Sequence, residues 1–181
     1  MRNFIYLQPS LPPELTIRGA FPVFYYQQTD AAIYGLDASV HYQLNTAILL
    51  TGKTSLLRAR DLINDKWVVM MPADNVSGKV AYQFGDKGKW QNMYADVEVE
   101  HVFKQTRTYA DEDYVAAPDA YTLTNISIGS DILFNSIKLA WSIEADNLFN
   151  VTYRDYLNRF RYFADDMGRN ITLRIKIPLT I

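Results

Sequence analysis

Apolar and polar residues alternate with a period of two along most of the chain. In the last segment, apolar side chains occupy every second position from Ile171 to Ile181, with mainly polar ones between them. The same alternation occurs at residues 137–145, 95–99 and 34–44. Alternation of this kind gives a β-strand one apolar and one polar face. No stretch keeps the helical period for long, so the sequence predicts an all-β protein.

The pattern predicts about eight strands joined by connections of two kinds. The strands are expected at residues 3–8, 22–44, 47–60, 76–85, 90–106, 119–132, 136–149 and 169–180. Long connections are expected at 9–21, 61–75, 107–118 and 150–168, and short ones near Leu44, Gly85 and Phe134. Short turns at one end and long loops at the other are typical of antiparallel up-and-down outer-membrane barrels.

Two local features make the pattern less regular. Pro12 and Pro13 are expected in the long loop 9–21, because proline cannot donate a hydrogen bond to a strand ladder. Within 120–131 the phase of the alternation slips, which leaves open either a β-bulge or a weaker pattern.

Two architectures fit the alternation. A soluble sandwich or a lipocalin-like barrel would turn its apolar faces toward a shared core. A membrane barrel would turn them toward lipid and keep the polar face inside. Strands of soluble proteins usually have 3–10 residues, whereas the segment 90–106 has about 17 and the segment 22–44 is longer still. This length favours the membrane barrel.

Composition narrows the range of functions. The chain has 181 residues, 18 basic and 20 acidic side chains, two histidines and no cysteine. This near balance of charge gives no reason to expect nucleic acid as a partner, and a chain without cysteine has no disulfide or thiolate metal site. The sequence has no phosphate-binding loop and no nucleophile or zinc-protease motif, so we expect no catalytic residues, no metal site, no cofactor and no enzymatic activity.

Specific segments of the chain resemble one known family. The run DNLFNVTYRDYLNRFRYFADDMGRNITLRIKIPL, residues 146–179, resembles the C-terminal end of TonB-dependent outer-membrane receptors, which commonly carry an NLFN box and a GRN stretch before the last strand. The segment IRGAFPVFYYQQTDAAIYGLDASVHYQL, residues 17–44, is similar to another region of these receptors. LRARD at 57–61 and MPADN at 71–75 resemble the loop that follows.

The resemblance implies an architecture and a function. Complete members of the family have a signal peptide, a segment that contacts TonB, a plug domain and a barrel of 22 strands. Residues 1–181 have room only for the C-terminal part of such a barrel, so we expect no plug domain and no signal peptide within them. The implied partners are outer-membrane lipid, the rest of the barrel, the plug and TonB. The implied function is energised uptake of a scarce solute, such as a ferric siderophore, across the outer membrane of a Gram-negative bacterium.

The end of the chain departs from the family pattern. Outer-membrane barrels usually finish with an aromatic residue, whereas this sequence ends Pro178-Leu179-Thr180-Ile181. The difference puts efficient assembly in question, although Ile181 keeps the apolar phase.

Candidate binding residues gather in the long loops and on the polar strand face. Aromatic and arginine side chains in extracellular loops can grip an anionic chelate by stacking and bidentate hydrogen bonds, or can pack the loops on one another. The loop candidates are Trp67, Arg107, Tyr109, Tyr114, Tyr153, Arg154, Tyr156, Arg159 and Arg161. The candidates for facing the lumen or the plug, which could equally form a solvated or mutually paired face, are Asp37, Asp96, Glu98, Glu100, Glu144, Arg174 and Lys176.

Two further functions stay open at the level of sequence. Eight is the smallest commonly closed number of strands, so the chain could form a free-standing eight-stranded outer-membrane barrel. It could also be a soluble β-barrel binding protein, with its apolar faces hidden inside.

Overall fold

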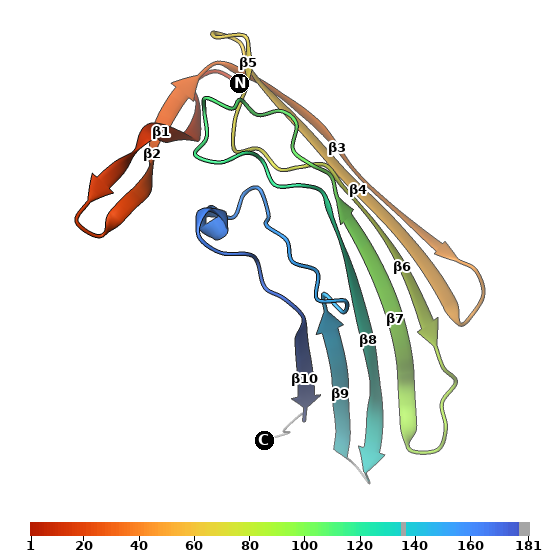
Figure 1. Cartoon of the computed structure of the whole chain (residues 1–181). Helices are drawn as coiled ribbons and strands as arrows, with labels where there is room; N and C mark the ends of the chain where they lie inside the picture. The colour runs from red at the N-terminus through yellow and green to blue at the C-terminus, as the bar shows by residue number, and fades with distance from the viewer. Residues whose placement is uncertain (135–136, 178–181) are drawn as a thin grey trace.

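One large antiparallel sheet dominates the computed structural model, which describes residues 1–134 and 137–177. Each strand lies beside its neighbours in the chain, as Figure 1 shows. The order of the long strands is β10 (Asn170–Lys176), β9 (Ile137–Asp146), β8 (Tyr121–Phe134), β7 (Trp90–Val102), β6 (Asn75–Gln83), β4 (Ile48–Asp61) and β3 (Ala31–Gln43). The two-residue strand β5 (Lys66–Trp67) pairs only with β4. The predicted all-β, up-and-down architecture is confirmed.

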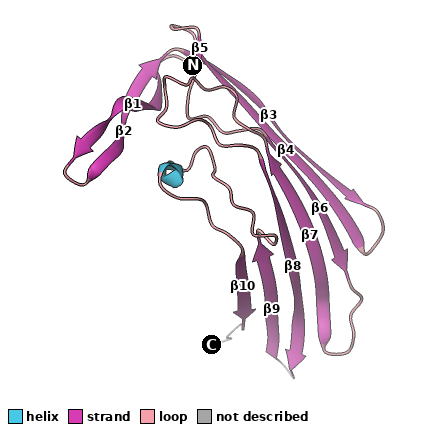
Figure 2. Cartoon of the chain, viewed as in Figure 1, coloured by secondary structure: helices cyan, strands magenta, loops and turns pink. Residues whose placement is uncertain are grey.

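The large sheet is curved and open. Its edge strands, β3 and β10, do not pair with each other in the described structure, and Figure 2 shows them at opposite edges of the sheet. An open sheet agrees with part of a larger barrel and differs from the closed eight-stranded barrel that was the alternative. No helix in the described residues is long and apolar enough to span a bilayer.

A separate hairpin corrects the prediction for the first 44 residues. Strand β1 (Phe4–Thr16) pairs with β2 (Gly19–Thr29) as a two-stranded sheet. The long loop predicted at 9–21 is therefore wrong, and the strand predicted at 22–44 is two strands that meet near Asp30. Pairing slips between Ser10 and Glu14, where the Leu11-Pro12-Pro13 segment lies. Two prolines fit within a strand here because the irregularity removes the need for their N–H groups.

The other predicted strand boundaries differ less from those of the structure. The segment predicted at 90–106 ends at Val102 and that predicted at 136–149 ends at Asp146. Short turns join β3 to β4 and β6 to β7 at one end of the sheet, and long loops lie at the other end, as expected. The short turn expected near Phe134 includes residues 135–136, and the chain end 178–181 carries the unusual terminus; both segments lie outside the described residues.

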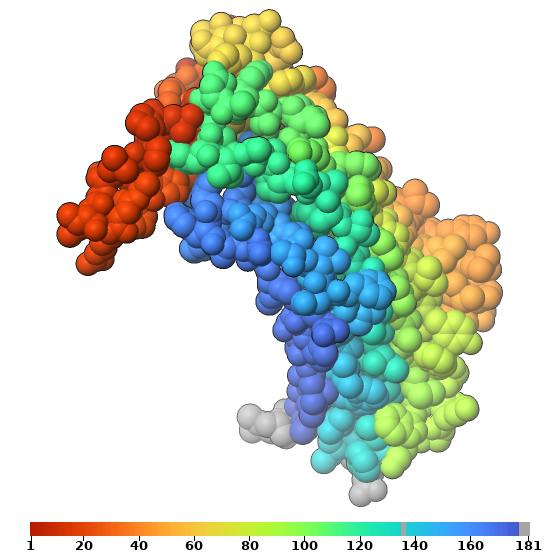
Figure 3. Space-filling view, viewed as in Figure 1, coloured from red at the N-terminus to blue at the C-terminus, as the bar shows by residue number. Residues whose placement is uncertain are grey.

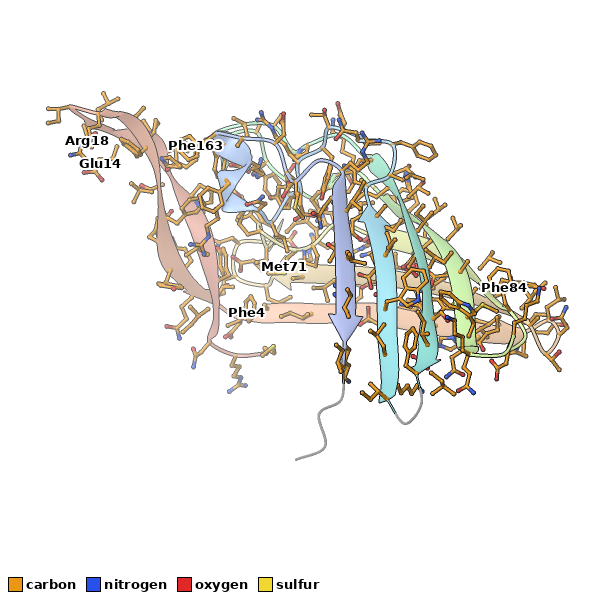
Figure 4. The ribbon with its side chains drawn as sticks, turned by 90° about the horizontal axis from the view of Figure 1, so that it is seen from below. Phe4, Glu14, Arg18, Met71, Phe84 and Phe163 are labelled. Atoms are coloured by element: carbon orange, nitrogen blue, oxygen red, sulfur yellow. The ribbon has the colours of Figure 1, made fainter. Side chains whose placement is uncertain are left out.

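Strand register separates an apolar from a polar face. Val97 lies opposite Ile126, and the next residues along, Asp96 and Ser127, also face each other. The apolar side chains are exposed: Leu173 keeps 62% of its surface accessible. The small buried cluster around Ala31 and Val68 lies at the long-loop end of the sheet, where Figure 4 shows Phe4 and Met71 approaching it. The wide apolar face therefore has no covering layer in the described chain, as a lipid-facing surface requires.

The polar face carries pairs of complementary groups. The ammonium of Lys79 lies 2.9 Å from Asp96, which also accepts a hydrogen bond from Ser127 at 2.6 Å. The long loops lie over the concave side of the sheet, as Figures 1 and 3 show. In one of them Tyr153 packs against Tyr121, a residue on the polar face, with ring centroids 4.5 Å apart and the rings tilted by 36°. The polar face is therefore the concave one.

The same register explains the phase slip in segment 120–131. Strand β8 pairs with β7 without interruption from Tyr121 to Gly129, so no bulge lies there. Tyr121 and Leu123 instead lie on the polar face, beneath the loop that follows β9. The irregularity of this ladder lies in β7, between Gln91 and Tyr94.

A charge on the apolar face tests this assignment. Leu173→Arg places a guanidinium on the outward face of β10, where such a change costs about 2–4 kcal/mol near the bilayer centre. We expect less of the variant protein to integrate into membranes, measured as the fraction that resists urea extraction. Thr172→Arg, on the opposite face of the same strand, should leave that fraction nearly unchanged. Equal losses in both variants would contradict a lipid-facing apolar surface.

Candidate functional site

Four segments interlock at the outer end of the sheet and form what we call the mouth cluster. They are the β1–β2 hairpin, residues 62–74, residues 103–120 and residues 147–169. The hydroxyl of Tyr114 accepts a hydrogen bond from the N–H of Val23 at 2.9 Å and lies within hydrogen-bonding reach of the carbonyl oxygen of Ser10. Tyr114 thereby ties the loop after β7 to both strands of the hairpin. Figure 3 shows these segments in contact on one side of the sheet.

Arg161 lies at the centre of the mouth cluster and is fully buried. The short helix η1 (Arg159–Tyr162) carries it, and its guanidinium pairs with the carboxylate of Asp113 from the neighbouring loop. The rings of Tyr156 and Tyr162 lie 4.9 and 4.6 Å from the guanidinium carbon. The Tyr162 hydroxyl also donates to Asp113 at 2.8 Å. A buried charge enclosed in this way fixes two loops to each other.

A second ion-pair network lies around Asp74. Arg58 on β4 donates two hydrogen bonds to its carboxylate, at 2.6 and 2.8 Å, and Arg107 donates a third at 3.0 Å. The hydrogen bonds from Arg58, helped by the charge of Arg107, lower the pKa of Asp74 although partial burial opposes the shift. Arg107, in the 103–120 segment, is therefore held by the neighbouring 62–74 segment.

The NLFN box and the GRN stretch meet in space. The side chain of Asn150 accepts a hydrogen bond from the N–H of Arg169 at 2.9 Å. A Cβ atom added to Gly168 would lie 2.7 Å from the Asn150 side-chain oxygen, so a larger residue there would displace the side chain that holds Arg169. Asn147, the first residue of the box, holds Val151 through hydrogen bonds of 2.8 Å in both directions. The two motifs close the base of the loop between β9 and β10.

The remaining loop candidates also contact the protein itself. Arg154 pairs with Asp165 at 2.6 Å, and the Tyr109 hydroxyl accepts from the Trp67 N–H at 2.7 Å. Tyr156 is buried. Arg159 is exposed, with its guanidinium 5.4 Å from the Phe24 ring centroid. The structure thus brings the nine candidates into one region. Most of their polar groups form hydrogen bonds or ion pairs within the mouth cluster. Their role in ligand binding stays a prediction.

The candidates on the polar face lie on the concave side. Asp37 accepts a hydrogen bond from Ser55 at 2.5 Å, and Glu144 pairs with Arg174. Glu98 and Glu100 have no side-chain hydrogen bond or ion pair with the described residues. Lys176 and Arg174 line a hollow near the short-turn end of the sheet, together with Trp141. Contact of these side chains with a plug is untested.

The sequence-based predictions did not include one partly enclosed polar pocket beside Trp67. It has a volume of about 240 Å³ and lies between the β1–β2 hairpin, the 62–74 segment and Glu112. Its polar lining comes largely from Tyr6, Gln8, Gln27, Asp61 and Asn64. Three of these lie in the β1–β2 hairpin, part of which was wrongly predicted as the loop 9–21. The pair Gln27-Gln28 directly after Tyr25-Tyr26 was the available signal.

The described residues, 1–134 and 137–177, contain no group of three histidine or carboxylate side chains placed to hold a metal ion. The chemistry of the mouth is therefore that of neutral hydrogen-bonding groups, aromatic rings and paired charges.

Removing the counter-charge of Arg161 should loosen the mouth cluster. Asp113→Asn leaves a buried guanidinium without its carboxylate, and breaking a buried pair from one side costs about 3–5 kcal/mol. We expect faster cleavage of residues 103–120 and 147–169 in limited proteolysis. Arg159→Met, which changes an exposed arginine of the same helix, is the control and should leave the cleavage rate close to that of the unaltered protein. Unchanged cleavage of Asp113→Asn would show that the pair does not hold the loops.

Asp74 makes the mouth cluster sensitive to acid. Because its folded pKa is lowered, its contribution is complete above the ordinary aspartate pKa of about 4 and is lost as the pH falls through the lowered value. Asp74→Asn should lower the melting temperature at pH 7 and reduce the further decrease between pH 5 and pH 2. Asp65→Asn removes an exposed partner of Arg60 and should change neither quantity much. The same acid-induced decrease in Asp74→Asn and the unaltered protein would assign the sensitivity to other groups.

Comparison with known structures and proteins shows the same architecture. The chain is similar to a structure named "Copper transporter OprC", with a TM-score of 0.73 and 17% sequence identity. The alignment covers 96% of this chain and 26% of that one, so the chain spans about a quarter of its length. At this identity the likeness shows the fold. No curated protein matches the sequence.

The family assignment comes from the sequence. The family model described as "TonB dependent receptor-like, beta-barrel" matches residues 1–151. This range includes β1 to β9 and ends just after the NLFN box, so the match is independent of most of the C-terminal segment that carried the resemblance. With the open antiparallel sheet, its outward apolar face and its interlocked loops, the match shows that the chain belongs to the β-barrel family of TonB-dependent receptors.

Proposed function

We propose that this chain forms one side of the barrel wall and part of the outer mouth of a receptor that takes up a scarce solute across the outer membrane of a Gram-negative bacterium. The observation that carries the proposal is the division of the sheet between an exposed apolar face and a concave polar face beneath the mouth cluster. A wall between lipid and an aqueous path needs this division. Family membership supports the outer-membrane location and energy coupling through TonB.

The polar face is proposed to meet the plug domain. Glu98 and Glu100 project from the concave side of β7, and neither carboxylate pairs with a described side chain. Asp37, on the far side of the sheet, lies on the same face. Unpaired carboxylates on an enclosed surface call for cationic or hydrogen-bonding partners. In this proposal the plug supplies these partners. The segment that contacts TonB belongs, with the plug, to the part of the receptor outside this chain.

A bulky chelate such as a ferric siderophore is the first candidate cargo. The mouth cluster presents aromatic rings and arginine side chains, including the exposed Arg159, which suit a large ligand with anionic groups. Copper is the second candidate, because the similar structure is named a copper transporter. The described residues contain no group of three histidine or carboxylate side chains that could hold the metal.

Uptake by intact cells tests the proposal. In the source bacterium, deletion of the codons for residues 31–177 removes the large sheet from the receptor that contains it. We expect loss of TonB-dependent accumulation of radiolabelled ferric siderophore, with copper accumulation measured in parallel. A strain lacking TonB is the control and should show the same loss. Recovery of the chain in the soluble fraction without detergent, or uptake that persists after the deletion, would overturn the proposed function.

A further inference from the structure

The polar pocket beside Trp67 differs in chemistry from the rest of the mouth cluster. Its volume is about 240 Å³, and it opens between the β1–β2 hairpin and the segment that contains β5. Carboxamide side chains dominate it: Gln8 and Gln27 from the two strands of the hairpin, and Asn64 from the turn after β4. Tyr6 lies next to them and donates its hydroxyl hydrogen to Gln8 at 3.3 Å.

The charged groups of the pocket are already engaged by other parts of the protein. The carboxylate of Asp61 accepts hydrogen bonds from Thr29, from the N–H of Ile63, and from both the N–H and the side-chain amide of Asn64. The ammonium of Lys66 pairs with Glu112 at 2.7 Å. A carboxylate with four donors has little capacity left for a cation, and a paired ammonium attracts an anion weakly.

Neutral donors and acceptors therefore remain for a ligand. The side-chain amide of Gln27 makes no hydrogen bond within the described protein, and Gln8 retains its amide hydrogens because only its oxygen is engaged. The side-chain oxygen of Asn64 is likewise unengaged. Carboxamides that offer both donors and acceptors match hydroxyl groups, which also do both. Trp67 borders this array, and the guanidinium carbon of Arg60 lies 5.4 Å from the centroid of its ring.

We infer that this pocket binds one ring of a neutral polyhydroxylated ligand, that is, a hexose-sized sugar unit. The volume lies just below the range usual for drug-sized ligands, which suits a single ring better than a complete chelate. The hydroxyl groups of a sugar, each a donor and an acceptor, match carboxamides that also offer both. The inference deepens the proposed function, because it makes a glycosylated or saccharide solute the cargo that the outer mouth first contacts.

Direct titration of the purified receptor tests the inference. The probes are methyl α-glucoside, methyl β-galactoside, methyl α-mannoside and their disaccharides, and inorganic phosphate and calcium are the charged alternatives. Isothermal calorimetry measures the binding of each probe. We expect at least one methyl glycoside to bind. Tighter binding of a disaccharide would identify the sugar as part of a larger cargo, and equal binding would identify a free monosaccharide. Binding of phosphate or calcium alone would overturn the inference.

Variants locate the binding in the pocket. Gln27→Leu removes an amide from the lining and should raise Kd about tenfold, the effect of losing one buried polar partner. Gln83→Leu changes an exposed glutamine at the short-turn end of the sheet and should leave Kd unchanged. Asn64→Ala is the second pocket variant if Gln27→Leu does not fold, as judged by heat-dependent mobility in gels. Equal affinity in the pocket variants and the control would place the binding elsewhere.

The uptake assay separates this inference from the proposed function. TonB-dependent uptake without binding of any glycoside would overturn the sugar pocket and leave the receptor assignment intact. Glycoside binding without TonB-dependent uptake would support the sugar pocket and overturn the receptor assignment.

Discussion

Because successive side chains of a strand point to opposite faces, one register decides both surfaces of the large sheet. Pairing Val97 with Ile126 places the apolar residues of neighbouring strands together, and it necessarily places Asp96 beside Ser127 on the other face. A slip by one residue would turn carboxylates toward the surface that has no protein cover. The division between lipid-facing and lumen-facing surfaces, on which the whole functional interpretation depends, follows from this ladder.

The mouth cluster is held by a different kind of interaction. Few large apolar side chains are buried in the chain, and the loops are joined instead by charges and hydroxyl groups: Arg161 with Asp113, Arg58 and Arg107 with Asp74, and Tyr114 with the hairpin. Buried pairs of this kind add less stability than an apolar core, but they are directional and fix loops in one arrangement. Such contacts can keep the shape of a receptor mouth that has no apolar core.

The same contacts change how the loop aromatics and arginines are interpreted. Residue type alone makes Tyr156 and Arg161 look like ligand contacts, yet both are buried against protein. In the pocket beside Trp67, the carboxamides of Gln8, Gln27 and Asn64 keep donors or acceptors that no described residue engages. In our proposal, recognition and structure are assigned to different residue types within one cluster: paired charges hold the loops, and neutral amides face the pocket.

Prediction from sequence succeeded where a period of two controls the structure. Strands β4, β6, β7, β8, β9 and β10 lie within a few residues of their predicted positions, and the alternation of short turns with long loops is confirmed. It failed at the β1–β2 hairpin, because Pro12 and Pro13 indicate a loop unless a pairing irregularity is known to accommodate them. It also left the meaning of the phase slip open, since only the loop lying over Tyr121 explains an aromatic residue on the polar face.

The sequence by itself determined the strand period, the family and the two chemically distinct faces, because these are properties of neighbouring residues along one chain. Only the tertiary structure decided which loop residues hold the mouth together and which line a pocket. The reason is distance in the chain. Arg161 and Asp113 are 48 residues apart, and Tyr114 and Ser10 are 104 residues apart. Contacts of that span depend on the curvature of the sheet and on the bend of the hairpin, which no local pattern encodes.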